Sequence, residues 1–290
     1  MPLLVLLLIA VAAGLLAGRA ARRATRRRAP IDALAHDAAR VPPLRRLLTS
    51  RLDPEAATGL ALTLALAIVL LGGIALAALA GVVRSHSGTL ALDSSVARWG
   101  DRHATAASTD GLKLVTDLGE TWFVAVGGLA LLAIEWRRTR NRWVVAFLLA
   151  VVLGDKLLTT VIKDLLDRSR PDLNRVAATL GPSFPSGHSS TAAAFWAGAA
   201  LIASRWAGRH AWPAFAGAAV GIAVGVAASR VLLDVHWLTD VLGGLALGWA
   251  WFAACAIAFG GRVLRFGASV ENVRQQTWIS EHESLARPRP

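Results

Sequence analysis

Two histidines and a carboxylate occur in polar strings that border the apolar segments of this chain. His236 precedes Asp240 by four residues, so both side chains share one face if a helix begins near Asp234. A carboxylate beside an imidazole fixes the tautomer through one ring nitrogen and makes the other nitrogen more nucleophilic. The pair predicts a histidine nucleophile; the alternative is a histidine at a helix start beside a first-turn carboxylate, without chemistry.

A second string, Pro185-Ser186-Gly187-His188, stands directly before another apolar segment. Pro and Gly favour a tight turn, after which the backbone N–H groups of Ser186 and Gly187 point at an anion at the helix N-terminus. His188 is then placed to protonate a leaving oxygen. In isolation, these four residues describe only a loop that enters a helix.

Three cations, Lys163, Arg170 and Arg230, accompany the histidines. An arginine fork binds phosphate oxygens in pairs, and a lysine acts as a point charge. Cations that flank membrane segments are common, so these indicate chemistry only together with the histidines. The whole set predicts phosphoryl transfer. The cations would neutralise the phosphate, and the sequence holds no other cluster of metal ligands, so we expect neither a metal nor a cofactor.

The composition indicates which elements position these residues. Of the 290 residues, 55% are hydrophobic and 17% charged, whereas soluble domains carry about a quarter charged residues. The apolar residues form long blocks, and about 20 such residues cross a bilayer. The net charge of +12 comes largely from arginines that flank the blocks, which indicates membrane topology and not nucleic-acid binding. The predicted spans are 2–18, 59–83, 118–134, 143–162, 190–204, 212–228 and 238–259.

The distribution of Lys and Arg predicts the orientation. With Met1 outside, the inner connections carry 21 of these residues and the outer connections 9, as the positive-inside tendency requires. All three strings then lie at the outer face, and the C-terminus lies in the cytoplasm. Six arginines between residues 19 and 28 follow the first span, and no basic segment precedes it. This pattern favours an N-out signal anchor over the alternative, a cleaved signal peptide.

Two further segments carry expectations. A short interfacial helix is predicted around 92–100, with Asp93 as its N-cap and Trp99 at headgroup level. Asp155 and Lys156 are adjacent charges inside the fourth span, where charged side chains normally face a bundle interior or a partner.

The order, spacing and shared membrane side of the three strings resemble the tripartite signature of the type-2 phosphatidic acid phosphatase superfamily. The positions that match are Lys163, Arg170-Pro171, Pro185-Ser186-Gly187-His188, Ser229-Arg230, His236 and Asp240. Asp234 stands where Gly is frequent in that family, and Leu238 where Pro is common. The extra carboxylate of Asp234 would repel phosphate or bind a headgroup, which leaves the substrate open.

The resemblance implies an all-α fold, a polytopic transmembrane helical bundle in which a six-helix phosphatase core gains one N-terminal helix. We expect three parts: an anchor helix with a basic cytoplasmic segment (1–58), the phosphatase domain (59–260) and a cytoplasmic tail (261–290). Pro42-Pro43 and Pro54 are expected to break any long helix in the first part.

The resemblance also implies roles for single residues. His236 attacks phosphorus, Asp240 orients it, and His188 protonates the leaving oxygen and then activates water. The phosphate oxygens are held by Lys163, Arg170, Arg230, Ser186 and Gly187. The expected function is that of a plasma-membrane lipid phosphatase that acts at the outer leaflet.

The sequence leaves the substrate and several alternative functions open. The substrate would be phosphatidic acid, phosphatidylglycerol phosphate or a polyprenyl diphosphate. A lipid phosphotransferase would use the same residues. Soluble vanadium-dependent haloperoxidases share the signature but lack the spans, and a non-enzymatic transporter or scaffold would need more charges within them.

Overall fold

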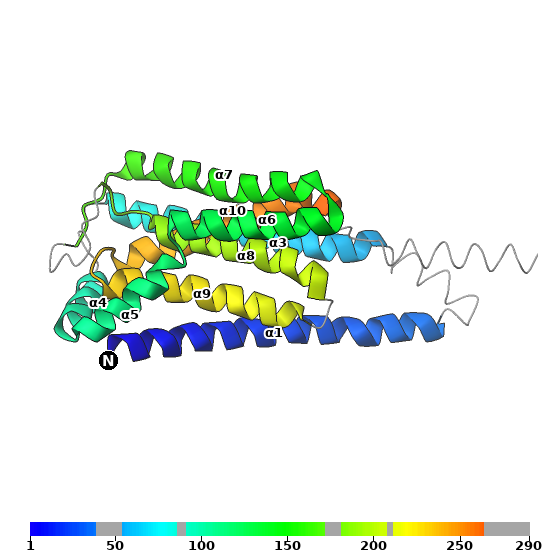
Figure 1. Ribbon diagram of the computed structural model, residues 1–290, viewed down its shortest axis with the longest axis horizontal. Helices are drawn as coiled ribbons and strands as arrows, with labels where there is room; N and C mark the ends of the chain where they lie inside the picture. Colours follow the sequence, from blue (N-terminus) through cyan, green and yellow to red (C-terminus); the bar gives the residue numbers. More distant parts are fainter. Residues whose placement is uncertain (39–53, 86–90, 172–180, 208–210, 264–290) are drawn as a thin grey trace, which may run out of the picture.

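The computed structural model describes residues 1–38, 54–85, 91–171, 181–207 and 211–263. Every regular element in these residues is an α-helix (Figure 1). The helices are α1 (Pro2–Ala38), α3 (Pro54–Arg84), α4 (Ala91–Arg102), α5 (Ala106–Asp117), α6 (Thr121–Thr139), α7 (Arg142–Leu166), α8 (Gly187–Ala207), α9 (Trp212–Leu232) and α10 (Leu238–Val263). The expected all-α fold is confirmed.

A helix lies at each of the seven predicted spans, but not all are equally apolar. Within the described residues, α1, α3, α7, α9 and α10 contain stretches long and apolar enough to cross a membrane. Helices α5 and α6 meet at a bend of 44° and qualify only as one broken span. The 21-residue α8 does not qualify, since polar residues occupy both of its ends: His188, Ser189 and Ser190 in the first turns and Arg205 in the last turn.

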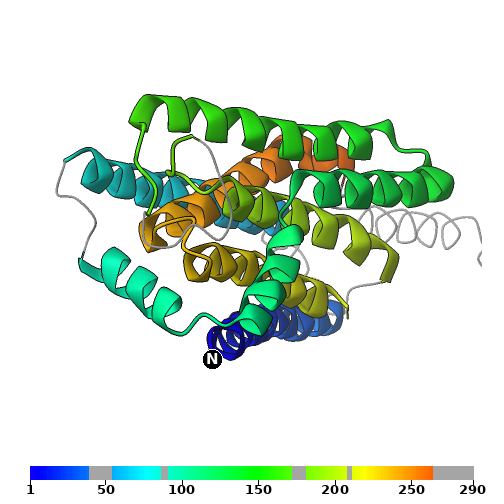
Figure 2. The ribbon, with the colours of Figure 1, turned by 60° about the vertical axis from the view of Figure 1, so that its left-hand side comes forward.

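Helix α8 is less apolar because it forms the centre of the bundle. It packs against α7, α9 and α10, and ten of its residues are buried. Figure 2 shows α8 enclosed by the other long helices. Its closest approach is to α10 at Gly248, where an added Cβ would overlap the backbone oxygen of Ser190. At Gly244, an added Cβ would lie 2.5 Å from the backbone oxygen of Ser186, just before α8. Small residues let two membrane helices approach at backbone distance.

The N-terminal helix α1 lies along α9 with a similar contact. A Cβ at Gly14 would meet the Gly217 oxygen at 2.8 Å, and one at Gly217 would meet the Gly14 oxygen at 2.6 Å. This helix runs beyond the predicted span and continues through the arginine-rich segment to Ala38.

Pro54 occupies the first position of α3, where proline is tolerated because its missing N–H would have no helical partner. The segment 39–53, which contains Pro42-Pro43, lies outside the described residues.

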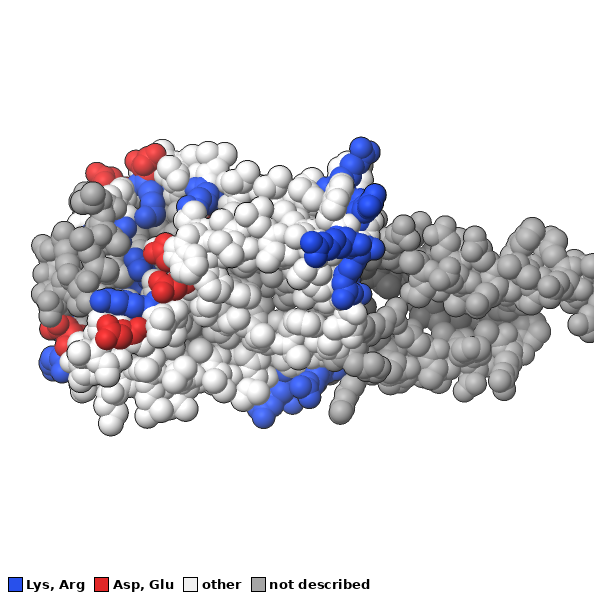
Figure 3. All heavy atoms as spheres, viewed as in Figure 1, with Lys and Arg blue, Asp and Glu red and all other residues white. Residues whose placement is uncertain are grey.

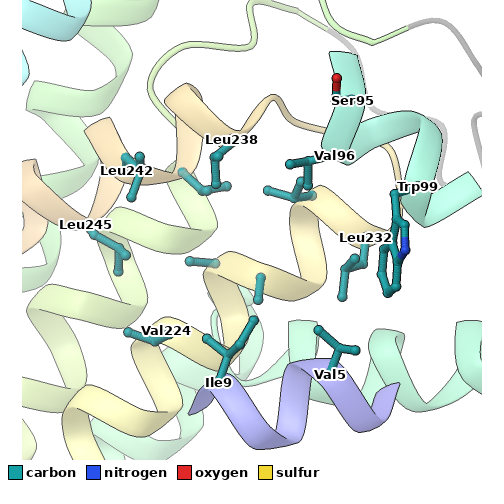
Figure 4. Close-up of a pocket in the computed structure, with 14 residues that line it drawn as sticks. Val5, Ile9, Ser95, Val96, Trp99, Val224, Leu232, Leu238, Leu242 and Leu245 are labelled. Carbon is teal, nitrogen blue, oxygen red and sulfur yellow. The ribbon is translucent and has the colours of Figure 1, made fainter. Parts of the chain in front are cut away.

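An apolar cavity of ≈ 450 Å³ lies between α1, α4, α9 and α10 (Figure 4). Its walls include Val5 and Ile9 of α1, Trp99 of α4, and Leu238 of α10. The short helix predicted around residues 92–100 is present as α4, and Trp99 lines this cavity.

On the face shown in Figure 3, the charges gather toward the two ends of the bundle, with few between them. One end, called here the string end, holds the α7–α8 and α9–α10 connections and the N-terminus (Figure 1). The opposite end holds Arg137, Arg138, Arg140 and Arg142, around the turn between α6 and α7. The fold thus brings all three strings to one end of the bundle.

Candidate active site

Three regions far apart in the sequence meet at the string end. The last turn of α7 supplies Lys163, and the first turn of α8 supplies His188. Arg230 stands in the last turn of α9, and Asp240 stands in the first turn of α10. His236 lies in the short connection between α9 and α10, and Arg170 in the loop after α7.

His236 lies between a carboxylate and a guanidinium. Its Nδ1 is 3.4 Å from Asp240 Oδ2, and its Nε2 is 3.2 Å from Arg170 Nη1. A proton on Nδ1 bonds the carboxylate, which leaves the lone pair of Nε2 to accept from Arg170. Burial lowers the pKa of His236 to about 3, although the Asp240 hydrogen bond opposes this shift. The imidazole is therefore neutral near pH 7, with Nε2 available as a nucleophile once a phosphate draws Arg170 away.

Asp240 is held more firmly than its pairing with His236 requires. Its Oδ2 accepts from the backbone N–H of Trp237 at 2.9 Å, and its Oδ1 accepts from Arg168 Nη1 at 2.5 Å. The second Arg168 nitrogen, Nη2, donates to Asp93 Oδ2 at 3.0 Å. This carboxylate–guanidinium–carboxylate row fixes the oxygen that faces His236.

The role of Asp93 corrects the sequence-based expectation. Asp93 lies inside the first turn of α4 and not at its N-cap. Its buried carboxylate accepts from the backbone N–H and the hydroxyl of Thr239, at 2.9 and 2.7 Å, besides Arg168. It therefore fastens α4 to the start of α10. Sequence spacing does not reveal this contact, since 146 residues separate the two partners.

The three predicted phosphate-binding cations lie close enough to act on one another electrostatically, and Arg170 and Arg230 also act on His236. Lys163 Nζ donates to the Pro182 oxygen at 3.0 Å. Arg170 donates from Nε to the Gly181 oxygen at 2.9 Å and from Nη1 to the Val235 oxygen at 2.9 Å.

Arg230 differs from the other two cations. It is 3% exposed, and its Nε has no hydrogen-bond partner within the described part of the chain. A buried guanidinium nitrogen without an acceptor is costly, and an anionic oxygen at this point would satisfy it.

The structure changes what can be expected of Ser186. Its backbone N–H donates to the backbone oxygen of Asp240 at 3.0 Å, so it does not point toward an anion. Its hydroxyl accepts from Ser189 at 2.9 Å. The reason is the close contact of α8 with α10, which places the second string against the first turn of α10. Ser186 is thus part of the wall, and Gly187 keeps the predicted position at the start of α8.

His188 has a carboxylate partner that the sequence analysis missed. Its Nε2 lies 2.7 Å from Glu120 Oε1, and Glu120 also caps α6 through the N–H of Thr121 at 3.3 Å. Burial lowers the pKa of His188 below its ordinary 6.5, while the Glu120 bond opposes the shift. The available signal was a lone carboxylate beside an apolar segment, but its partner is 68 residues away.

The two charges predicted inside the fourth span point in different directions. Asp155 is fully buried and accepts from the hydroxyls of Ser190 and Thr191 on α8. Lys156 is exposed and donates to Thr121 Oγ1 at 2.6 Å. Asp155 therefore holds the first turns of α8 against α7. Among the residues that the structure describes, no group of three or more His, Cys, Asp or Glu is placed to hold a metal ion.

Comparison with known proteins identifies this arrangement. The PAP2 superfamily matches residues 143–263. Decaprenylphosphoryl-5-phosphoribose phosphatase of Mycobacterium tuberculosis is 34% identical over 153 residues, which are 51% of this chain and 77% of that protein. The chain belongs to the PAP2 superfamily. The resemblance drawn from the three strings is confirmed.

Other PAP2 proteins extend the comparison. Phosphatidylglycerophosphatase B of Bacillus subtilis is 39% identical over 112 residues, which are 38% of this chain and 55% of that protein. The chain thus spans about half the length of this curated relative. The crystal structure of a transmembrane PAP2-type phosphatidylglycerolphosphate phosphatase from Bacillus subtilis superimposes with a TM-score of 0.59 and 28% identity. The match covers 70% of this chain and 98% of that one. The chain is therefore a multi-pass membrane protein.

The structure shows what surrounds the two departures from the PAP2 pattern. Asp234 has a φ of 57°, a left-handed conformation that glycine adopts freely and that Asp tolerates better than most residues. Its carboxylate is buried, so it is not an exposed site for a headgroup. Leu238 begins α10 and lines the apolar cavity of Figure 4.

Proposed function

We propose that this PAP2 protein is a lipid phosphatase that removes phosphate from a lipid mono- or diphosphate through a phosphohistidine at His236. The observation that carries the proposal is the placement of a neutral, buried imidazole between Asp240 and three converging cations. Relatives named as phosphatases of phosphatidylglycerophosphate, lipid A and a decaprenyl phosphate derivative support a lipid substrate.

In the first step, Nε2 of His236 attacks phosphorus as the bond from phosphorus to the lipid oxygen breaks. Asp240 stabilises the imidazolium that forms, because its carboxylate faces Nδ1. Lys163, Arg170 and Arg230 bind the equatorial oxygens, where negative charge concentrates. We assign the N–H of Gly187 to the same task, whereas that of Ser186 is already used. His188 gives its proton to the departing lipid oxygen.

In the second step, His188 accepts a proton from water, and the oxygen of that water attacks the phosphohistidine. The bond between phosphorus and nitrogen breaks, inorganic phosphate leaves, and both histidines return to their starting states. Glu120 holds the ring of His188 for both transfers.

The proposed orientation puts the string end at the outer face of the plasma membrane. The arginines of the α6–α7 turn lie at the opposite end, which the positive-inside tendency assigns to the cytoplasm. A reporter fused after Pro290 should therefore be read as cytoplasmic. A periplasmic signal from this fusion would reverse the proposed orientation.

The deciding experiment is an assay of phosphate released by the purified protein. The panel should hold phosphatidic acid, phosphatidylglycerol phosphate and a polyprenyl diphosphate, each with and without EDTA. We expect release from at least one lipid that EDTA does not reduce, because cations of the chain neutralise the phosphate. Failure with every lipid would overturn the proposal, and loss with EDTA that Mg²⁺ restores would overturn metal independence.

A further inference from the structure

A chain of polar contacts leads from the membrane-facing side of α7 to His188. Lys156 Nζ donates to Thr121 Oγ1 at 2.6 Å. The backbone N–H of Thr121 donates to Glu120 Oε2 at 3.3 Å, and Glu120 Oε1 lies 2.7 Å from His188 Nε2. These contacts connect Lys156, on the lipid-facing side of α7, with His188, which protonates the leaving group in the proposed function.

The position of Lys156 is unusual for a cation. Its neighbours on the exposed side of α7, Leu153 and Leu157, are 61% and 65% exposed, as expected of residues that face lipid. The adjacent Asp155 turns inward to Ser190 and Thr191. Within the described residues, Lys156 forms no ion pair. A charged side chain at membrane depth is costly and marks a functional position by default.

The depth of Lys156 along α7 places it on the bilayer side of the phosphate-binding residues. It precedes Lys163 by seven residues, which is two turns or about 10 Å along the helix. Lys163 belongs to the cations around His236, so Lys156 lies below the transferring phosphoryl group, toward the bilayer. A lysine stem can extend along a helix toward the interface while its ammonium seeks polar groups. Its charge therefore lies on the bilayer side of the cations around His236, at the level where the lipid part of a bound substrate would have to continue.

We propose that Lys156 binds a second anionic phosphoryl group, which the lipid product keeps, and so favours substrates that carry one. The three candidate substrates differ in this respect. Phosphatidic acid leaves a neutral diacylglycerol, whereas phosphatidylglycerol phosphate leaves a phosphodiester anion. A polyprenyl diphosphate leaves a monophosphate. The spacing of two helical turns fits the phosphodiester best, because a glycerol unit separates its two phosphorus atoms.

This inference rests on the proposed function and names the substrate class of the same site. The test compares kcat/KM for phosphatidylglycerol phosphate and phosphatidic acid, presented in the same detergent micelles, in wild type and Lys156→Met. We expect the ratio of the two values to fall about tenfold or more, mainly through KM, since a hydrogen bond to a charged group contributes about 1.5–3 kcal/mol. Hydrolysis of phosphatidic acid should change by less than about twofold.

Three control variants separate recognition from structure. Lys156→Arg should keep most of the ratio, because it keeps the charge. Thr121→Val should keep it too, because it removes only the contact between α6 and α7. Lys113→Met removes an exposed lysine from α5 and should change nothing.

Each outcome decides one question. An unchanged ratio in Lys156→Met, or equal losses on both lipids with a lowered Tm, would overturn the inference while the phosphatase assignment stands. Loss of the ratio in Thr121→Val would assign the effect to the helix contact and would also overturn it. Wild type that releases phosphate from neither lipid would overturn the proposed function and this inference with it.

Discussion

The site contains two histidine–carboxylate pairs that differ in almost every physical respect. In the pair of His236 and Asp240, both side chains are buried, and two further donors hold the carboxylate. In the pair of His188 and Glu120, both side chains are partly exposed, at 21% and 37%. The buried pair is fixed in direction, whereas the partly exposed pair can exchange protons with water.

This difference matches the two roles in the proposed reaction. A nucleophile must present one nitrogen along the line of attack, so a rigid setting favours it. An acid that later becomes a base must meet both a lipid oxygen and water, so access to solvent favours it. The variants below test whether the two pairs are specialised in this way, from the largest expected effect to the smallest.

Loss of the nucleophile should be the most damaging change. We expect His236→Ala to lower phosphate release by roughly ten-thousand-fold or more on every substrate, since the covalent step cannot occur. His103→Ala, which removes an exposed histidine directly after α4, serves as the matched control and should retain activity. Near wild-type release by His236→Ala would disprove the covalent mechanism.

Loss of the charge of Asp240 should be the next largest change. In Asp240→Asn the imidazolium is no longer stabilised and the tautomer is no longer fixed, so kcat should fall by about a hundred- to a thousand-fold. Rapid quenching should show slower formation of the acid-labile phosphoenzyme. Asp110→Asn, at an exposed position of α5, is the control. Equal rates of phosphoenzyme formation in wild type and Asp240→Asn would contradict the fixed-direction role.

Loss of His188 should depend on the leaving group. A lipid alkoxide needs a proton to depart, whereas p-nitrophenolate leaves almost unaided. His188→Ala should therefore slow the pre-steady-state burst on a lipid phosphate about a hundred-fold, and on p-nitrophenyl phosphate far less. His236→Ala should abolish the burst on both. Equal burst losses for His188→Ala on the two substrates would remove His188 from the acid role.

Loss of the charge of Glu120 should give the smallest change, visible as a shift in pH dependence. Glu120 raises the pKa of His188 against the lowering effect of burial. In Glu120→Gln the pKa falls further, so the acid form is lost at a lower pH. The alkaline limb of kcat against pH should move toward acid, with a loss of a few-fold near pH 7. A limb that stays in place would show that Glu120 does not tune His188.

The two pairs also show how far sequence reasoning can reach. His236 and Asp240 are four residues apart, so helical geometry alone brings them together, and the strings name the cations beside them. The apolar blocks located every long helix, because bilayer thickness imposes their length. What could be predicted thus depended on local spacing or on the membrane.

The remaining contacts depend on tertiary packing. Glu120 reaches His188 only because the α5–α6 bend meets the first turn of α8. The position of Asp93 before an apolar helical segment predicts an N-cap, but its carboxylate instead accepts from Arg168 and Thr239, which are distant in the sequence. The N–H of Ser186 was assigned to an anion, and the close approach of α10 uses it instead. The periodicity of the sequence cannot predict such contacts between residues far apart in the chain.

The contact between α1 and α9 has a consequence for how the protein is made. Gly14 enters the membrane early in synthesis, and its partner Gly217 follows about 200 residues later. Until then the glycine face of α1 has only lipid or other helices beside it. Assembly of the bundle must therefore include a late, long-range docking step, which cannot begin until α9 has emerged from the ribosome. A nascent chain halted before α9 would hold α1 in the bilayer without its lasting neighbour.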